Sequence, residues 1–434
     1  MKNEYNNAMT QSKKAENVRD VIRYLRKFKD AVVVIYLDDK TIGSTLFSSH
    51  IRDIALLHQA GLKVVIIPGA RTRIDEVLSG AKIDWTYKDN IRITNDEAMP
   101  LVKMAAFDVT NTIMTNLAAN GITAVIGNWV RARAKGVLSG VDFGTAGEID
   151  KLDTESVRTV LKDGFIPLFP CIGWSSTGRP YNISSVILAN QIAVELKADK
   201  LFFVTGDNPG IISQGQIVPA MNIEEADEYI SKNPEETAIL KLARTACSKG
   251  VNRAHIVDGN IDGVLLTEIF SDLGSGTMIY TSNYGKIRPM EQNDIPSVLA
   301  LMRPFIESGK LLPRTEGDIA AAIKDYCVYE FDGGVRACAS LHFYEDGQAE
   351  IAAIAVDEAF SHMGIGFKMV DNLISLAKEA KAKTVFIMTT QAADWFEKLG
   401  FKEDSIESLP QARKAIWTPE RGSKAYRLFI TPQL

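Results

Sequence analysis

A strand that leads through a glycine turn into a helix is the feature that most limits what this chain can fold into. Residues Glu350 to Val356 are apolar after the first, which is typical of a strand covered on both faces. Gly364-Ile365-Gly366 follows, and Phe367 to Ala380 has the spacing of an amphipathic helix. Glycines there let backbone N–H groups converge on an anion, and the helix N-terminus adds a favourable dipole. The segment therefore predicts an anion-binding turn.

A second strand and helix follow in the same order. Thr384 to Met388 is a predicted strand, Thr389-Thr390-Gln391 is a turn, and the next helix carries Trp395 and Phe396. We interpret these two aromatic side chains as core residues. From Glu350 to Phe401 the sequence resembles the acetyl-CoA site of the GCN5-related N-acetyltransferases. The resemblance implies an acyltransferase that uses acetyl-CoA.

Length and charge narrow the class further. At 434 residues the chain is too long for one hydrophobic core, so two or three domains are expected. The 49 Lys and Arg against 54 Asp and Glu give a formal charge of −5 without a dense basic run, which argues against a nucleic-acid partner. Met1 to Asn17 lacks the apolar core of a secretory signal, and no window is long and apolar enough to span a membrane.

The four cysteines, Cys171, Cys247, Cys327 and Cys338, are scattered and form no Cys-x-x-Cys pair. This usage is typical of free thiols in a reducing compartment, so a cytoplasmic location is expected. Neither a zinc site nor any other metal site is expected from this pattern.

Strands and helices alternate through the first two thirds of the chain, which predicts an open, mainly parallel, three-layer α/β domain. An amphipathic helix over Val18 to Lys29 precedes it. A turn-rich joint at Ser282 to Gly285 then introduces a smaller mixed α/β domain with antiparallel strands. The predicted parts are an arm and helix at 1–30, a first domain at 31–281, a linker at 282–285 and a second domain at 286–434.

Several segments of the first domain resemble the amino-acid kinase family, including residues 68–71, 90–94, 201–210 and 240–259. A working kinase of that family has a Lys and a Gly-Gly at the end of its first strand. Here Tyr36 stands at the lysine position, and Asp38 and Asp39 replace the glycines. Two carboxylates would repel a triphosphate, whose transfer depends on charge neutralisation. We therefore interpret this domain as a kinase fold without kinase activity, although Lys241 still matches a nucleotide-contacting lysine.

Residues 268–277 resemble the arginine-binding signature of arginine-inhibited members of that family. In that interpretation Glu268 pairs with a guanidinium or amino group, and Gly274, Ser275 and Gly276 present backbone groups to the amino acid. Without the resemblance, the glycines would be interpreted as a tight turn. The resemblance also implies L-arginine as an allosteric effector. It further implies a homo-oligomer, with a hexamer as one candidate size.

Acetyl transfer to an amine needs an anchored diphosphate, a polarised thioester carbonyl and a neutral amine. Ser361 stands where the acetyltransferases usually have Arg or Gln, which leaves the anchoring to backbone groups. By resemblance, the backbone groups that bind the cofactor belong to Ile354, Ala355, Val356, Met363, Gly364, Ile365 and Gly366.

The proposed catalytic groups also come from the resemblance. Glu350 is the candidate general base, directly or through water, with a polar strand-end residue as the alternative. Thr389 or Thr390 could donate to the departing thiolate, or could simply cap the next helix. Arg314 and Arg421 would each bind a carboxylate of the substrate, because a guanidinium binds carboxylates bidentately.

Ser423 would add a hydrogen bond to the substrate, and Lys424 is an alternative cation.

The two resemblances cover roughly Val18 to Arg427 and imply the N-acetylglutamate synthase family, in which L-glutamate is the acetyl acceptor in the first step of arginine biosynthesis. Three alternatives remain open: an enzyme that also phosphorylates N-acetylglutamate, an arginine sensor with a vestigial acetyltransferase half, and an acetyltransferase for aspartate or another amino acid.

Overall fold

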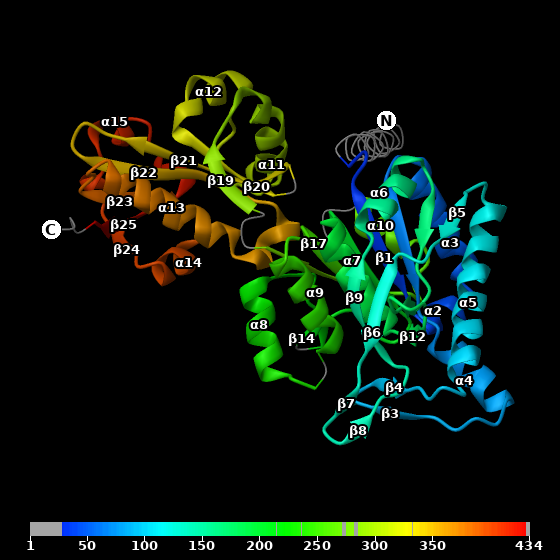
Figure 1. Cartoon of the computed structure of the whole chain (residues 1–434). Coiled ribbons are helices and arrows are strands. Elements are labelled where there is room, and N and C mark those ends of the chain that lie inside the picture. Colours follow the sequence, from blue (N-terminus) through cyan, green and yellow to red (C-terminus); the bar gives the residue numbers. More distant parts are fainter. Residues whose placement is uncertain are drawn as a thin grey trace. The chain divides into compact units, whose positions relative to one another are not determined.

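The computed structural model describes residues 28–213, 215–235, 237–270, 275–281, 285–331 and 333–430, without the side chains of residues 359, 362, 363 and 420 (Figure 1). The chain forms two compact units, Met1–Ser282 and Asn283–Leu434. The predicted helix at 18–29 lies almost wholly outside the described residues, as do Gly274 and three residues of the predicted linker. The fourth linker residue, Gly285, is the first residue of a strand.

The first unit has the predicted alternation of strands and helices. Asn95 Oδ1 accepts a hydrogen bond from Ala98 N (2.7 Å) and so caps the turn that precedes helix α5. The elements are β1 Val32–Leu37, α2 Asp39–Ile42, α3 Phe47–Gln59, β2 Lys63–Pro68, α4 Arg71–Gly80, β3 Thr86–Lys88, β4 Ile91–Ile93, α5 Met99–Ala119, β5 Ala124–Ile126, β6 Val130–Ala134, β7 Val137–Leu138, β8 Val141–Asp142, β9 Gly147–Leu152, α6 Thr154–Lys162, β10 Ile166–Leu168, β11 Ile172–Trp174, β12 Pro180–Asn182, α7 Ser185–Leu196, β13 Lys200–Thr205, β14 Ile212–Ser213, β15 Gln216–Ile217, β16 Ala220–Asn222, α8 Ile223–Lys232, α9 Ala238–Ser248, β17 Arg253–Asp258, α10 Val264–Phe270 and β18 Thr277–Tyr280.

An eight-stranded sheet forms the centre of this unit, in the order β16-β18-β17-β13-β1-β2-β10-β5. Every neighbouring pair is parallel except β17 and β18. Alternate residues of β1 enter different cores: Val34 packs with helices α6, α7 and α9, whereas Val33 and Ile35 pack with α3, α5 and α10. Helices therefore cover both faces, which confirms the predicted three-layer, mainly parallel fold.

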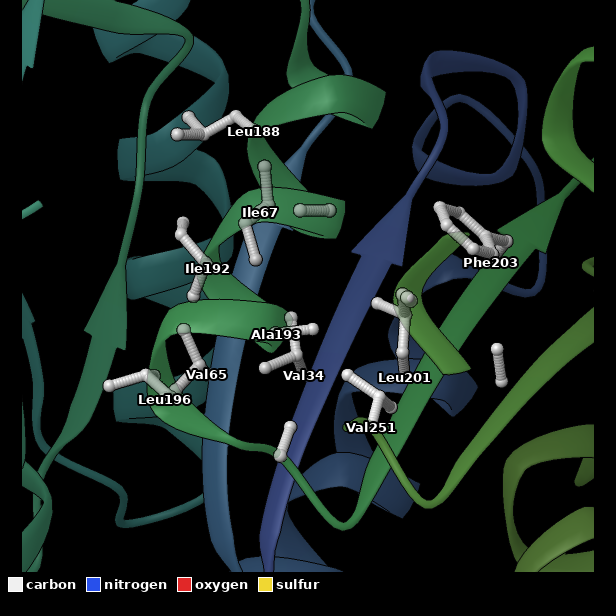
Figure 2. Close-up of a cluster of buried hydrophobic side chains, with 14 of the residues drawn as sticks. Val34, Val65, Ile67, Leu188, Ile192, Ala193, Leu196, Leu201, Phe203 and Val251 are labelled. Atoms are coloured by element: carbon white, nitrogen blue, oxygen red, sulfur yellow. The ribbon is translucent and has the colours of Figure 1, made fainter. Parts of the chain in front are cut away.

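Helix α7 shows how the sequence positions a covering layer. Leu188, Ile192 and Leu196 are spaced by four residues, so their side chains share one face of the helix. All three are buried against β1 and β2, where Val34 and Val65 are also fully buried (Figure 2). Burying side chains of this size contributes roughly 1.5–3 kcal/mol each. Helix α7 therefore helps to hold β1 and β2 in place, and with them the polar residues Asp38 and Asp39 that follow β1.

The second unit is built on a seven-stranded sheet in the order β19-β20-β21-β22-β23-β25-β24. All pairs are antiparallel except β22 and β23, which are parallel. This confirms the predicted mixed α/β domain. Its elements are β19 Gly285–Pro289, η1 Gln292–Asp294, α11 Ile295–Glu307, α12 Glu316–Ala321, η2 Ile323–Asp325, β20 Tyr326–Phe331, β21 Gly334–Phe343, β22 Gln348–Val356, η3 Glu358–Met363, α13 Ile365–Glu379, β23 Thr384–Thr389, α14 Ala393–Lys398, β24 Lys402–Asp404, η4 Ile406–Ser408, α15 Gln411–Lys414, η5 Pro419–Arg421 and β25 Lys424–Phe429.

Two further findings concern the whole described chain. None of its helices combines the length and the apolar character needed to cross a membrane. All four cysteines are free and buried, and burial raises the pKa of Cys327 to about 11 and of Cys338 to about 12. The thiols of the second unit therefore stay protonated near neutral pH, which does not favour a cysteine nucleophile.

Candidate functional site

Strands β22 and β23 pair only at their beginnings. The ladder runs from Gln348, opposite Thr384, to Glu350, opposite Phe386, and stops there although both strands continue. A bulge in the β21–β22 ladder lies at the same place, and Ala353 adopts a φ of 54°. Bulges bend a strand and are frequent beside active sites. The two strands part here, so the backbone edge of Ile354 to Val356 that faces β23 is unpaired.

This parting corrects one expectation about β22. The sequence predicts a strand covered on both faces, and this is so for Ala349 to Ile351. Beyond them Ala352, Ile354 and Val356 are only half-buried, whereas Ala353 and Ala355 are buried. One face of the strand's end is therefore open. An apolar strand can be covered by a helix or by an apolar ligand, and its sequence is the same in both cases. The sequence alone therefore could not show that this face is open.

The glycine turn lies where the sequence places it. Gly364 precedes α13 with a φ of 63°, a left-handed conformation that strains any residue with a Cβ. No side chain caps this helix, so the first backbone N–H groups of α13 are available to an anion. Met363 ends η3, and Ser361 donates to the Glu358 carbonyl (2.8 Å). The structure thus places the predicted cofactor-binding backbone in the second unit: a parted strand and an uncapped helix N-terminus.

Trp395 differs from the sequence interpretation. Phe396 is buried as expected, but Trp395 is 36% exposed. A Cβ on Gly366 would lie 3.4 Å from the Trp395 ring and 3.6 Å from Val356, so the indole lies beside the glycine turn and the open end of β22. Adjacent residues of a helix point in different directions, so in this six-residue helix Phe396 faces the core and Trp395 does not. Trp395 therefore lies beside the glycine turn rather than in the core.

The two threonines after β23 have different roles. Thr389 Oγ1 accepts a hydrogen bond from Ala392 N (3.0 Å), so it caps the turn that leads into α14. Thr390 Oγ1 is buried and has no hydrogen-bond partner among the described residues. A buried hydroxyl without a partner is costly, and a ligand group would satisfy it. Both hydroxyls keep a proton to donate, because Thr389 Oγ1 only accepts, but Thr390 is the one with no partner at all among the described residues.

Glu350 lies on β22 at the last residue pair before the strands part, and it is buried. Its carboxylate accepts hydrogen bonds from Arg413 Nε (2.9 and 3.0 Å) and from the Tyr344 hydroxyl (2.7 Å). Burial and the Glu350 charge raise the pKa of Tyr344 above its ordinary value. Arg413 and Tyr344 therefore hold the Glu350 carboxylate in place where the two strands part.

Three arginines gather near this carboxylate. Burial first, and then the charges of Arg413 and Arg314, lower the pKa of Arg421, so the three guanidinium groups lie close to one another. Arg421 donates to the Lys310 carbonyl (3.2 Å), and Ser423, two residues further on, is buried. Of the three arginines Arg413 pairs with Glu350, and neighbouring cations of this kind favour a bound anion. The predicted substrate residues thus converge in the second unit.

Sequence reasoning missed Arg413 and Tyr344. Arg413 is 63 residues from Glu350 along the chain, and no motif marks it. Tyr344 directly follows β21 on the hairpin that precedes β22, which is the only local signal that could have suggested it. Lys424, the alternative cation, pairs instead with Glu403 (2.9 Å) and is exposed, so its charge is already neutralised.

The candidate effector residues lie in the first unit. Glu268 on α10 is buried; its Oε1 contacts His255 Nδ1 (2.9 Å), and its Oε2 accepts a hydrogen bond from Gly276 N (3.3 Å). The buried Ser275 hydroxyl has no partner among the described residues. Burial alone would raise the pKa of Glu268, but these two donors hold it below its ordinary value. The structure thus brings Glu268, Ser275 and Gly276 together around one buried carboxylate.

Acid should destabilise this part of the first unit. Burial, aided by nearby Lys200 and Arg253 and opposed by Glu268, lowers the pKa of His255 to about 4. An unfolded histidine gains its proton near pH 6.5, so between about pH 6.5 and 4 the unfolded state binds more protons and stability falls as the pH falls. We expect the free energy of unfolding to drop by about 2 kcal/mol from pH 7 to pH 5. Denaturant unfolding at the two pH values measures this, and the loss should be largely absent in His255→Gln. An equal loss in both proteins would contradict the assignment to His255.

Asp38 and Asp39, which stand where a kinase of this family has glycines that bind phosphate, form hydrogen bonds within the chain. Asp38 accepts hydrogen bonds from Thr41 N (2.7 Å) and Gly206 N (2.9 Å), and Asp39 accepts one from Thr72 N (3.0 Å). All lie at the carboxyl edge of β1, β2 and β13. Tyr36 is largely buried, and burial with the Asp38 charge raises its pKa. The two carboxylates therefore take the backbone amides that an anion would use.

Lys241, the other residue of the kinase resemblance, donates to the Pro234 carbonyl (2.7 Å). Among the described residues, no group of three or more His, Cys, Asp or Glu side chains is arranged to hold a metal ion.

Comparisons with known proteins agree with this geometry. Residues 31–258 match the amino acid kinase family, and residues 300–401 match the acetyltransferase (GNAT) family. The fold and site thus define a GNAT acetyltransferase joined to an amino-acid kinase-like unit. The amino-acid acetyltransferase of Shewanella oneidensis is 32% identical over 422 residues, covering 93% of this chain and 95% of that protein. The enzyme of Vibrio vulnificus is 31% identical over 426 residues, with 93% and 96% covered. The chain belongs to the amino-acid acetyltransferase family and is an amino-acid N-acetyltransferase.

Solved structures give the same result. The chain is similar to N-acetylglutamate synthase from Neisseria gonorrhoeae complexed with coenzyme A and L-arginine, with a TM-score of 0.79 and 28% identity over 96% of this chain and 99% of that one. A second structure of that protein, complexed with coenzyme A and N-acetyl-glutamate, gives a TM-score of 0.62 with the same coverage.

Proposed function

We propose that the enzyme transfers the acetyl group of acetyl-CoA to the amino group of L-glutamate, as the first step of arginine biosynthesis in the cytoplasm. The observation that carries this proposal is the gathering of Arg314, Arg413 and Arg421 near the buried carboxylate of Glu350. An amino acid with two carboxylates and one ammonium needs several cations and one anion. The relative with bound N-acetyl-glutamate supports the same acceptor.

The residues divide into three roles. The uncapped N-terminus of α13, with Gly364 to Gly366, binds the diphosphate, and the unpaired edge of Ile354 to Val356 aligns the pantetheine and thioester. Arg314, Arg421 and Ser423 bind the carboxylates of glutamate. Arg413 was not predicted as a substrate residue; its Nε orients Glu350, and its remaining N–H groups are available to the same carboxylates.

The reaction is direct attack of the neutral amine on the thioester. Glu350 takes a proton from the substrate ammonium directly or through water. Thr390, whose buried hydroxyl has no partner among the described residues, donates to the departing thiolate. Trp395 closes the side of the pocket next to the glycine turn.

We further propose that L-arginine regulates the enzyme as a feedback inhibitor through the first unit. Glu268 supplies a buried carboxylate for a guanidinium or amino group, and Ser275 and Gly276 supply polar groups beside it. The relative with bound L-arginine supports this effector. A homo-oligomer, with a hexamer as one candidate size, is part of the same proposal and rests on the family resemblance.

The negative charges of Asp38 and Asp39 argue against the alternative in which the enzyme also phosphorylates N-acetylglutamate. Asp38 and Asp39 already bind the amides of Thr41, Gly206 and Thr72, so a triphosphate would have to displace two carboxylates from their hydrogen bonds. The sensor alternative has less support than catalysis, because the second unit retains an open strand edge, an uncapped helix and a free hydroxyl.

The decisive experiment measures the CoA thiol released from acetyl-CoA with L-glutamate, with and without L-arginine. We expect glutamate-dependent release, no release with L-aspartate at the same concentration, and inhibition by arginine. Glu268→Gln, which keeps the volume of the side chain and removes its charge, should weaken that inhibition while uninhibited turnover changes less than about twofold. Glu307→Gln, an exposed carboxylate on α11, is the matched control. Release without an acceptor, or only with another amine, would overturn the proposed substrate.

A further inference from the structure

A chain of three polar side chains crosses the second unit beside Glu350. Ser340 Oγ lies 3.0 Å from His342 Nε2, and His342 Nδ1 lies 2.8 Å from Asp325 Oδ2. A carboxylate can only accept, so Nδ1 carries the proton, and Nε2 of the neutral ring then accepts the Ser340 hydroxyl. The chain therefore has a single direction, from the serine hydroxyl through the imidazole to the carboxylate.

The chain begins in the interior and ends at solvent. Ser340 is fully buried on β21, the His342 side chain is 28% exposed, and the Asp325 side chain at the end of η2 is 42% exposed. No residue of the proposed acetyl-transfer mechanism belongs to it. Satisfying one buried serine hydroxyl does not require a histidine and an aspartate, because a nearby backbone carbonyl would suffice.

Strand register places the buried end of the chain on the substrate side. Ser340 lies opposite Tyr326 on β20 and Ala352 on β22, and His342 lies opposite Glu350. Residues directly opposite one another project from the same face of a sheet. Burial raises the pKa of Tyr326, and the charge of Arg314 and the Ser340 hydroxyl oppose that rise. The buried end therefore lies on the same face of the sheet as Glu350, next to Tyr326.

The proposed reaction needs a route for one proton. The substrate enters as an ammonium, R–NH₃⁺, and leaves as an amide, R–NH–CO–CH₃. A C–N bond forms, the C–S bond of the thioester breaks, and two protons leave the nitrogen. One of them converts the CoA thiolate into the thiol, and the other must reach bulk water. Glu350 must release the proton that it accepts before it can act as a base in the next turnover.

We propose, building on the proposed function, that Ser340, His342 and Asp325 form the exit by which the surplus proton leaves the acceptor site. The Ser340 hydroxyl passes its proton to His342 Nε2 as it receives one from the site. The imidazolium then releases a proton at Nδ1 to Asp325 and water. Exchange of the remaining ring proton with water at the partly exposed His342 restores the Nδ1–H form for the next turnover. The three residues do not touch substrate; they are positioning residues for proton departure, and the tests below separate that role from a structural one.

The test uses Ser340→Ala, His342→Ala and the double variant in the full-length enzyme. Each single variant should lower kcat about 10- to 100-fold while KM for acetyl-CoA and for the amine change less than about threefold. The double variant should be no slower than the slower single variant, because residues of one chain act as a unit. Losses that multiply, or a raised KM with unchanged kcat, would overturn the proposal. His58→Gln is the matched control: its ring also contacts an oxygen, Gly164 O at 3.0 Å, but in the first unit.

A rescue experiment distinguishes proton transfer from packing. Imidazole and pyrazole have the same size, but only imidazole is basic near neutral pH. Added imidazole should restore kcat of His342→Ala severalfold, and pyrazole should not. Equal rescue by both, or by neither, would overturn the relay. If the wild-type enzyme releases no CoA thiol with glutamate, the proposed substrate fails, and the same variants are then measured with the amine that it does acetylate, which tests the relay separately.

Discussion

Glu350→Gln should lower kcat for glutamate acetylation about 100-fold or more, with little change in KM for either substrate. A side chain that accepts the proton of the reacting amine contributes about 10²- to 10⁴-fold to the rate. Glutamine keeps the volume of Glu350 and can still accept from Arg413 Nε while its amide faces Tyr344. It carries no charge and is not a base. Steady-state kinetics with varied glutamate and varied acetyl-CoA separate kcat from the two KM values.

Tyr344→Phe is the matched control for this variant. It removes one hydrogen bond to the same carboxylate (2.7 Å) and leaves the charge of Glu350 in place. We expect a loss of kcat of about tenfold, since one hydrogen bond to a charged group contributes roughly 1.5 kcal/mol. If the two variants were equally impaired, or if Glu350→Gln kept more than a tenth of the wild-type kcat, Glu350 would be an anchor for Arg413 rather than a base.

Arg421→Ala should raise KM for glutamate about 100-fold and KM for acetyl-CoA less than about threefold. Removing one partner of a buried, charge-assisted contact costs about 2–5 kcal/mol of binding. In the described chain Arg421 has no carboxylate partner; it donates to the Lys310 carbonyl, and burial and two neighbouring arginines lower its pKa. A cation in such an environment gains strongly from an incoming carboxylate, so the effect should fall on the acceptor.

Arg303→Ala controls for the loss of a positive charge in the same unit. Arg303 is an exposed residue of α11. Its removal should change both KM values less than twofold, because an exposed charge contributes little. Equal increases in KM for glutamate and acetyl-CoA in Arg421→Ala would indicate a general disturbance of the site and would rule out a specific carboxylate contact.

The features that the sequence predicted well are local. Asp153 precedes helix α6, and its carboxylate accepts a hydrogen bond from Ser156 N (3.1 Å), a cap of the kind that Asp provides. The glycine turn before α13 is local in the same way, because a positive φ is a property of one residue and its neighbours. Strand order and layers followed from alternation along the chain. Short-range preferences of this kind are written in consecutive residues, so a single sequence reveals them.

The features that it could not predict depend on residues that are distant in sequence. The pairing of Arg413 with Glu350 and that of His342 with Asp325 depend on how the sheet brings separate strands together. The open end of β22 depends on where β23 stops pairing with it, and an apolar strand looks the same whether a helix or a ligand covers it. The substrate arginines were suggested by family resemblance, since a lone surface arginine has no local signal.

The carboxylates of Asp38 and Asp39 have a consequence for how a catalytic domain can change its task. In a nucleotide enzyme, a bound phosphate can pair with strand-end amides of this kind. Here two side chains supply a built-in counterion for the amides of Thr41, Gly206 and Thr72. The pairing of these amides therefore does not depend on a bound nucleotide. A kinase-like scaffold that carries its own counterions holds this edge of the sheet in place without a cosubstrate.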